Sequence, residues 1–270
     1  MKTLQNHTLI YDNECPMCNI YSKGFIKAGM LDQKGREAFK ELSLKNKNLI
    51  DFYRAKNEIA LVDHEKNQVI YGLDSLLLII GNSFPTLEKI ARVKPLHWFF
   101  KKLYSFVSYN RKQIIPSAKD HSGEACVPDF NLKYRLTYIA FVLIFSSYVL
   151  SIFSSKLGLN LNQNFGREFV ICLSQIIWQT LFLRRYLKVK LWDYLGNMMT
   201  VSLIGTLLLI SALFLNLNPT LSVVYFGIAV FIMFLEHIRR CKILKLNFLP
   251  TISWMIFRMT VLIILILSNK

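Results

Sequence analysis

Residues 7–18 read HTLIYDNECPMC, and a helical pattern continues from there to about residue 29. The apolar run at 7–12 predicts a short buried strand that opens a domain. Proline is favoured at the first position of a helix, where its missing N–H would be unpaired in any case. Pro16 therefore predicts Cys15 as the N-cap residue and places Cys18 one turn into the helix. A strand, a C-x-x-C and a helix in this order indicate a dithiol redox site.

The two cysteines of this motif are not expected to be equivalent. Cys15 is predicted at the exposed tip of the helix, where unpaired amide donors and the helix dipole favour a thiolate. Cys18 lies on the same face and is predicted to be more shielded. We therefore expect Cys15 to have the lower pKa and to attack first, and Cys18 to resolve the mixed disulfide.

Two acidic residues accompany the cysteines. Asp12 has two interpretations: it accepts the proton of Cys18 during exchange, or it caps the cysteine helix and ties down the turn after the strand. Glu14 is expected to be an exposed neighbour of Cys15. The predicted catalytic residues are Cys15, Cys18 and Asp12.

The remaining pattern of the first half supports a small α/β domain. Residues 58–63 and 68–72 predict a hairpin, and residues 73–81 predict a helix. The stretch 36–56 is ambiguous and is read as a strand near 36–42 and a helix near 46–55. This order of elements is the thioredoxin-like plan.

The string Asp12-x-x-Cys15-x-x-Cys18 after an apolar strand resembles the DCC family of predicted thiol–disulfide oxidoreductases, which is named after that motif. The elements YGLDS at 71–75 and YNR at 109–111 also resemble this family, so that the similarity covers about residues 7–115. The segment 126–135 resembles the connector of membrane-attached members. The resemblance implies a thioredoxin-like fold and dithiol chemistry at Cys15 and Cys18.

One position departs from the thioredoxin pattern. Thioredoxins usually carry a cis-proline at the start of the hairpin, and Ala60 stands at that place here, after Ile59. A cis bond before a residue other than proline costs about 3–4 kcal/mol, so a trans bond is expected. The usual backbone contact with substrate is therefore in question, and there is more room for a metal at the cysteines.

Three alternatives to a simple redox enzyme stay open. Cys15, Cys18, His121 and Cys126 are ligand types that zinc accepts, although more than one hundred residues separate Cys18 from His121. Cys126 is also a candidate third thiol in a relay to a quinone or a membrane protein. A membrane anchor or partner-binding protein with a degenerate redox domain is the third alternative.

The second half of the chain has the composition of a membrane region. Hydrophobic residues make up 53% of the chain and charged residues 19%, and 14 of the 17 acidic residues lie before residue 136. A helix needs about 20 apolar residues to cross a bilayer. We predict about five spans, of which the second is short enough to suit a re-entrant or interfacial segment. They are residues 136–154, 168–183, 197–215, 219–235 and 249–267.

The loops that carry most Lys and Arg, 184–196 and 237–248, fall on the same side as the N-terminal domain if there are five spans. That side is predicted to be cytoplasmic. The N-terminus lacks the apolar core of a signal peptide. In a reducing compartment the five cysteines are not expected to form structural disulfides. The net charge of +16 is attributed to the flanks of the spans and to anionic lipid, not to nucleic acid.

The sequence thus predicts a thioredoxin-like redox domain at 1–115, a basic connector at 116–135 and a transmembrane helical domain at 136–270. The aromatic cluster at 97–106, with Lys101 and Lys102, predicts a helix packed on the domain or lying at the bilayer interface. We expect a multi-pass cell membrane protein with membrane lipid and an unknown protein or small-molecule disulfide or dithiol as partners. No cofactor, metal or nucleic acid is expected.

Overall fold

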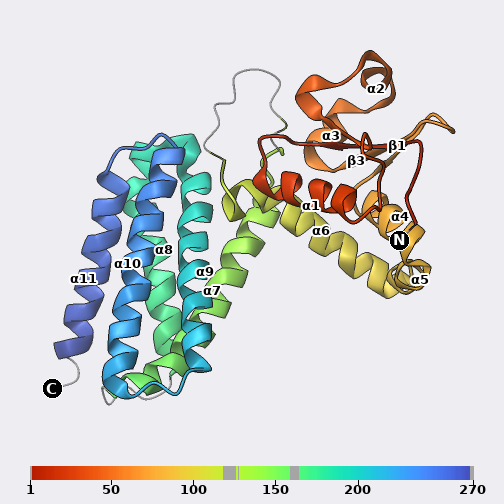
Figure 1. Ribbon diagram of the computed structural model, residues 1–270. Coiled ribbons are helices and arrows are strands. Elements are labelled where there is room, and N and C mark those ends of the chain that lie inside the picture. Colours follow the sequence, from red (N-terminus) through yellow and green to blue (C-terminus); the bar gives the residue numbers. More distant parts are fainter. Residues whose placement is uncertain (1, 118–125, 127, 159–163, 268–270) are drawn as a thin grey trace. The chain divides into compact units, whose positions relative to one another are not determined.

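The computed structural model describes residues 2–117, 126, 128–158 and 164–267. The chain divides into two compact units, Met1–Tyr134 and Arg135–Lys270. The first contains a small sheet with helices and the second contains long helices (Figure 1). The predicted fold class, a thioredoxin-like domain followed by an all-helical apolar region, is confirmed.

The first unit is built on a four-stranded mixed sheet with the order β2-β1-β3-β4. The central strand β1 pairs in parallel with β2 and antiparallel with β3, and β3 pairs antiparallel with β4. A β-α-β crossover followed by a β-hairpin is the thioredoxin-like arrangement that the sequence predicted. The strands are β1 (His7–Tyr11), β2 (Arg36–Ala38), β3 (Ala60–Asp63) and β4 (Gln68–Tyr71).

Alternating side chains of β1 and β3 supply a core on each face of this sheet, as a period of two requires. Leu9 and Leu61 face one cluster with partly buried side chains of α1, α4 and α6, whereas Ile10 and Val62 face a second cluster with α2 and α3. The helices of this unit are α1 (Pro16–Lys27), α2 (Leu44–Leu49), α3 (Phe52–Asn57), α4 (Leu73–Ser83), α5 (Pro85–Ala91) and α6 (Lys94–Ile114).

The ambiguous stretch 36–56 differs from its prediction in detail. The strand ends at Ala38 and passes into a 3₁₀ turn, η1 (Phe39–Glu41), and the expected single helix is two short ones. Ser43 and Asp51 cap α2 and α3 with their side chains, so each helix begins at its own capping residue.

The start of the hairpin is held by backbone hydrogen bonds at Ile59. Its N–H donates to the hydroxyl of Tyr104 at 2.8 Å, and its carbonyl accepts the N–H of Gly72 at 2.8 Å. No cis peptide bond occurs among the described residues, so the bond before Ala60 is trans as expected. Gly72 lies in the left-handed region with φ of 68°, and an added Cβ would meet a Glu58 oxygen at 3.0 Å.

We predict that Gly72→Ala lowers the free energy of unfolding of this unit by about 1–2 kcal/mol, because alanine is strained at positive φ. The matched control is Gly24→Ala in α1, where an added Cβ meets nothing within 4 Å. Alanine there gains helix propensity and is expected to be neutral or stabilising. Urea titration of the full chain in detergent, read by alkylation of the buried Cys126, measures both. Equal midpoints for the two variants would contradict the assignment.

Within residues 132–158 and 164–267, the second unit contains five apolar helices of 19 to 25 residues. Four continuous stretches are long and apolar enough to cross a membrane, and one of them, Phe165–Leu213, comprises two helices joined by a 3₁₀ turn. About five predicted spans are consistent with this arrangement. The helices are α7 (Leu132–Ser154), α8 (Phe165–Leu187), α9 (Leu191–Leu213), α10 (Pro219–Ile243) and α11 (Leu249–Leu267).

The second predicted span is longer than its apolar run suggested. Helix α8 has 23 residues, which at 1.5 Å per residue is about the thickness of a bilayer core. Gln179, within it, accepts a hydrogen bond from Tyr194 of α9 at 3.1 Å, and that hydroxyl also contacts His237 of α10 at 3.2 Å. Gln179 thus joins α8 to α9 through a buried hydrogen bond.

Candidate active site

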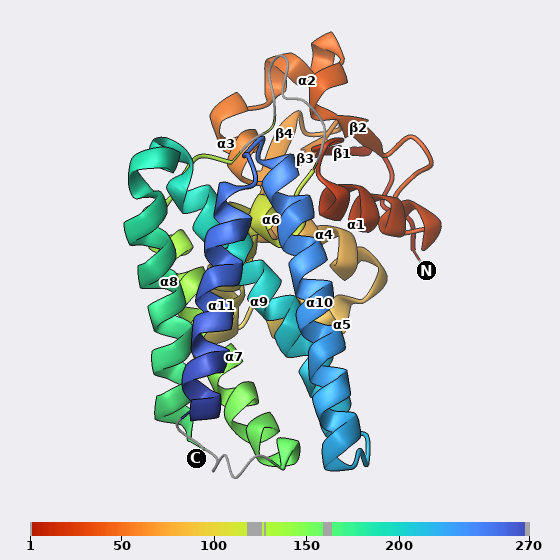
Figure 2. The same ribbon diagram turned by 90° about the vertical axis from the view of Figure 1, so that its left-hand side faces the viewer.

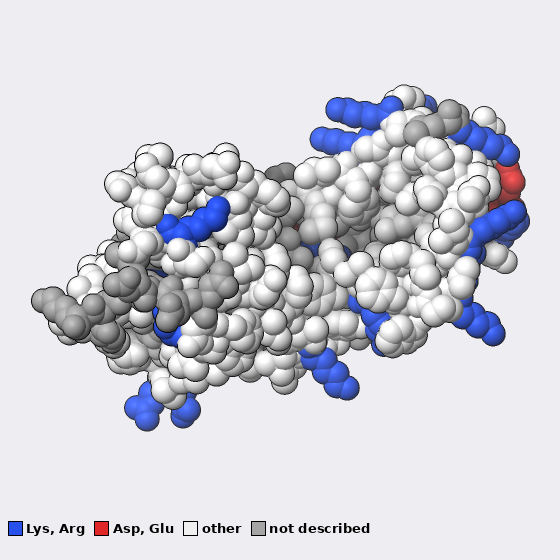
Figure 3. Space-filling model, turned by 90° about the horizontal axis from the view of Figure 1, so that it is seen from below, with Lys and Arg blue, Asp and Glu red and all other residues white. Residues whose placement is uncertain are grey.

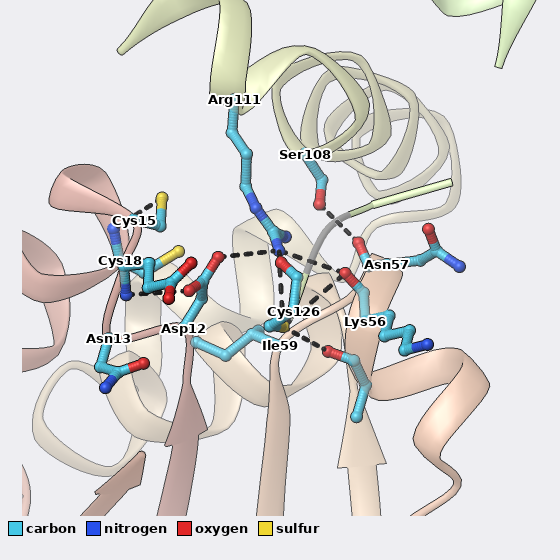
Figure 4. A network of polar contacts seen from close by, with 12 residues as sticks. Asp12, Asn13, Cys15, Cys18, Lys56, Asn57, Ile59, Ser108, Arg111 and Cys126 are labelled. Carbon is cyan, nitrogen blue, oxygen red and sulfur yellow. Dashed lines mark hydrogen bonds and ion pairs between the residues drawn. The ribbon is translucent and has the colours of Figure 1, made fainter. Parts of the chain in front are cut away.

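The C-x-x-C motif lies at the start of α1, directly after β1 (Figure 4). Cys15 is the N-cap residue, as predicted, and its sulfur accepts the backbone N–H of Cys18 at 3.4 Å. The N–H of Cys15 in turn donates to the carbonyl of Asp12 at 3.2 Å. Both cysteines are free thiols. The turn therefore presents two sulfurs to each other at a helix N-terminus.

The expected exposure of this helix tip is wrong. Cys15 is only 1% exposed and Cys18 5% exposed. Glu14 is also buried, in an ion pair with Lys40 of η1, so the expectation of an exposed glutamate is wrong as well. A helix end is exposed only where no distant segment packs over it, and here Lys40 and Arg111 both reach the motif.

The surroundings of the two thiols shift their pKa values in opposite directions. The pKa of Cys15 is lowered to about 6, because the Cys18 thiol and N–H donate to its sulfur, which outweighs burial; the positive charge of Arg111 adds to the effect. The same thiol hydrogen bond, together with burial, raises the pKa of Cys18 well above its ordinary value. At neutral pH the pair therefore holds one thiolate, at Cys15, and one thiol, at Cys18.

Asp12 is buried at the end of β1, where it ties down the turn. One carboxylate oxygen accepts the N–H of Glu14 at 3.0 Å, and the other lies 3.5 Å from a guanidinium nitrogen of Arg111. This is the structural interpretation that the sequence offered. Asp12 and Cys18 also line the same cavity, which keeps the carboxylate close to the site.

Arg111 of α6 is the residue of the site that the prediction from sequence missed. Its guanidinium is buried and donates to the carbonyls of Lys56 at 3.1 Å and Cys126 at 2.8 Å (Figure 4). Burial lowers the pKa of Arg111, but Cys18, Cys126 and Asp12 raise it above its ordinary value, so the group stays charged. The signal that pointed to it was the YNR element of the family resemblance.

The rest of that element, and the connector, fix the position of Arg111. Asn110 donates to the carbonyls of Phe106 and Tyr134 at 2.9 and 3.0 Å, and Tyr109 stacks on Tyr134 with ring centroids 4.9 Å apart. Asn57 is likewise bonded to Asp129 at 2.7 Å. The short motifs therefore act as a scaffold for the buried guanidinium.

Cys126 is brought close to the motif although it is 108 residues from Cys18 in sequence. Its sulfur lies 3.6 Å from Arg111 and donates to the carbonyl of Ala55 at 3.5 Å. Burial raises the pKa of Cys126 to about 11, against the opposing effect of Arg111. It is therefore a protonated thiol at neutral pH, with packing against the apolar core around Ile10 and Ala60.

A cavity of about 70 Å³ lies inside this group of residues. Cys18 lines it and Cys15 does not, so this partly open space adjoins the resolving position of the motif. It is large enough for a few water molecules, which need polar partners of the kind present here. The polar or sulfur-containing residues of its wall include Asp12, Cys18, Tyr21, Glu58, Tyr104, Ser108, Arg111 and Cys126.

Of the four candidate zinc ligands, the structure describes Cys15, Cys18 and Cys126. Cys126 contacts Arg111, and His121 lies outside the described residues. Within the described part of the chain, no three His, Cys, Asp or Glu side chains are grouped as a metal site would require.

The sheet order, the cysteine N-cap and the opposed thiol pKa values define a thioredoxin-like dithiol domain. Residues 9–116 match the model of the family described as DCC1-like thiol-disulfide oxidoreductase. The family resemblance is thus confirmed over this part of the chain. No curated protein and no solved structure gave a significant match.

We predict that the alkylation rate of Cys15 in the reduced protein is half-maximal near pH 6, because only the thiolate reacts and it forms above that pH. Cys18, whose pKa is raised, is expected to react far more slowly at pH 7. Iodoacetamide labelling with peptide mass spectrometry measures both sites. Urea-unfolded protein is the control, since both thiols then titrate near the ordinary value of about 8.5. Faster labelling of Cys18 would reverse the assignment.

The same measurement tests the contribution of Arg111. Arg111→Gln removes the charge and is expected to shift the Cys15 profile to higher pH, whereas Arg111→Lys keeps the charge and shifts it less. Arg54→Gln is the matched control, because that guanidinium is half-exposed and stacks on Tyr71. An unchanged profile in Arg111→Gln would exclude the electrostatic role.

Proposed function

We propose that this chain is a membrane-anchored thiol–disulfide oxidoreductase that acts on the cytoplasmic side through Cys15 and Cys18. The observation that carries the proposal is the hydrogen-bonded thiol pair at the start of α1, with the pKa of Cys15 lowered and that of Cys18 raised. The match of residues 9–116 to the oxidoreductase family supports the same chemistry.

The exchange has two steps. The Cys15 thiolate attacks one sulfur of a substrate disulfide, a mixed disulfide forms, and the other substrate sulfur leaves as a thiolate. Cys18 then loses its proton and attacks the Cys15 sulfur, which forms the Cys15–Cys18 disulfide and releases the second substrate thiolate. The substrate gains two electrons and the protein loses two. Run backwards, the same steps oxidise a dithiol substrate.

In the second step we assign Asp12 the role of the base that accepts the proton of the Cys18 thiol. The carboxylate is buried beside the motif, lines the same cavity as Cys18, and keeps its orientation through the bond from the Glu14 N–H. Arg111, 3.5 Å from it, balances negative charge in the site while Cys15 is a thiolate.

Substrate recognition is expected to differ from that of thioredoxins. Both backbone groups of Ile59 are already bonded within the domain, to Tyr104 and Gly72. A substrate strand therefore finds no free backbone donor at Ile59, and the Ile59 carbonyl already accepts one hydrogen bond. The partner, an unknown protein or small-molecule disulfide or dithiol, has to reach a Cys15 that is nearly fully buried.

The membrane part of the proposal rests on the helical unit. Its helices are long and apolar enough to cross a bilayer. The α8–α9 and α10–α11 turns, which carry the basic residues, lie at one end of the bundle and the α9–α10 turn lies at the other (Figure 2). Basic residues gathered at one end support a cytoplasmic location for that end.

We predict that Cys18→Ser traps covalent, reductant-sensitive adducts in cells, because Cys15 still attacks but no resolving thiol releases the partner. Cys15→Ser is expected to trap none and to lower reduction of an insulin-type disulfide to the level of the protein-free reaction. Cys172→Ser, in the helical unit, is the matched control and should behave as wild type. Equal trapping by Cys15→Ser and Cys18→Ser would contradict the assigned order of attack. A wild-type rate no higher than that of Cys15→Ser would favour a degenerate redox domain.

We predict that a reporter fused after Lys270 is active only when it is of the type that works outside the cytoplasm. Five spans and a cytoplasmic N-terminus place the two ends of the chain on opposite sides. A fusion placed in the turn at Lys188–Lys190 should report the cytoplasmic side and serves as the control. Cytoplasmic activity of the C-terminal fusion would indicate an even number of spans.

A further inference from the structure

The first unit exposes an unusual concentration of large apolar side chains on α5 and the first half of α6. Eight such side chains fall within residues 84–103, and each is between 38% and 64% exposed. An apolar patch of this kind on a soluble domain marks an interaction surface. They are Phe84, Leu87, Ile90, Val93, Leu96, Trp98, Phe99 and Leu103, and we refer to this set as the 84–103 face.

The contacts of α6 explain why these side chains stay uncovered. Tyr104 and Ser108 bond to the backbone of Ile59 and Asn57, which turns that side of the helix toward the domain. Leu96, Phe99 and Leu103, spaced by three and four residues, share a different side of the helix. At about 100° per residue, Trp98 lies beside this stripe, between it and the inward side and next to Lys101 and Lys102. The residues that pack inward and those that remain exposed are thus separated around the helix axis.

The exposed charges of the 84–103 face are mostly positive. The segment carries five exposed cations, and Glu88 is its one acidic residue. Arg92 is paired with Glu88 at 2.8 Å and with Asp74 of α4 at 3.3 Å, which leaves four lysines. Seen from the side on which α6 lies, the surface of this unit is largely uncharged, with Lys and Arg side chains around its margin (Figure 3). The exposed cations are Lys89, Arg92, Lys94, Lys101 and Lys102.

We propose that the 84–103 face is a membrane-docking surface, which places its apolar side chains in the interface of an anionic lipid leaflet. Aromatic and aliphatic side chains flanked by lysines have the character of helices that lie in a bilayer interface. The flanking cations match the charge of anionic head groups. The inference rests on the proposal that the helical unit of the same chain spans a bilayer, since this keeps a lipid surface within reach of the domain.

Trp98 provides a direct probe, because it is the one tryptophan in residues 1–135 and is 64% exposed. The full chain is reconstituted in vesicles of acyl-brominated phosphatidylcholine mixed with phosphatidylglycerol, and the emission of Trp98→Phe is subtracted from that of wild type. We expect the Trp98 signal to fall about twofold relative to non-brominated lipid and to resist aqueous iodide. Omitting phosphatidylglycerol should weaken the quenching.

Two variants of the same unit are matched controls. Leu44 of α2 is also exposed, so Leu44→Trp in the Trp98→Phe background should be quenched by iodide and not by brominated lipid. The pair Lys101→Glu and Lys102→Glu should reduce lipid quenching of Trp98, whereas Lys45→Glu with Lys47→Glu on α2 should leave it unchanged.

The inference is overturned if iodide quenches Trp98 and brominated lipid does not, because the face then lies in water. It is also overturned if neither quencher acts, because protein, such as a second copy of the chain, then covers the face. Trp178, Trp192 and Trp254 remain in Trp98→Phe and report the helical unit separately. If brominated lipid quenches these three and not Trp98, only the docking inference fails; if it quenches none, the membrane proposal fails.

Discussion

The buried guanidinium of Arg111 is the constraint on which the active-site end of the domain depends. A charge removed from water is tolerated only when surrounding groups replace its hydration. Here the carboxylate of Asp12 and the carbonyls of Lys56 and Cys126 surround one guanidinium nitrogen, while Nε is buried with no partner among the described residues. The three groups come from the turn after β1, from α3 and from the connector. The arginine therefore fixes three separate chain segments around the thiol pair and also contributes to the reactivity of Cys15.

The sequence was sufficient for the local geometry of the motif. Pro16 at the first helical position predicted the N-cap at Cys15, and the apolar run at residues 7–12 predicted a short buried strand. The burial of Cys15 and Glu14 was not predictable, because it depends on residues distant in the chain. Asp12 and Arg111 are 99 positions apart, and spacing alone does not reveal that they meet.

In the helical unit the limits of prediction are of a different kind. Hydropathy located the apolar centre of each helix, but helices continue through polar residues at their ends. Helix α8 was predicted over residues 168–183, and in the structure it runs over Phe165–Leu187 and includes Arg184 and Arg185. Gln175 and Gln179 are four residues apart and so share a face of α8, yet only Gln179 has a hydrogen-bond partner among the described residues. Which of the two amides bonds to a neighbouring helix depends on how the helices pack against each other, and this cannot be deduced from a single sequence.

The hydrogen bond between the two cysteines also determines how many protons accompany the electrons. Between the pKa of Cys15, about 6, and the much higher one of Cys18, the reduced pair holds a single proton. Reduction of the disulfide by two electrons then takes up one proton instead of two. The reduction potential should accordingly change by about 30 mV per pH unit, half the slope of about 59 mV for an ordinary dithiol. Such a couple keeps its oxidising strength more nearly constant when the pH of its compartment changes.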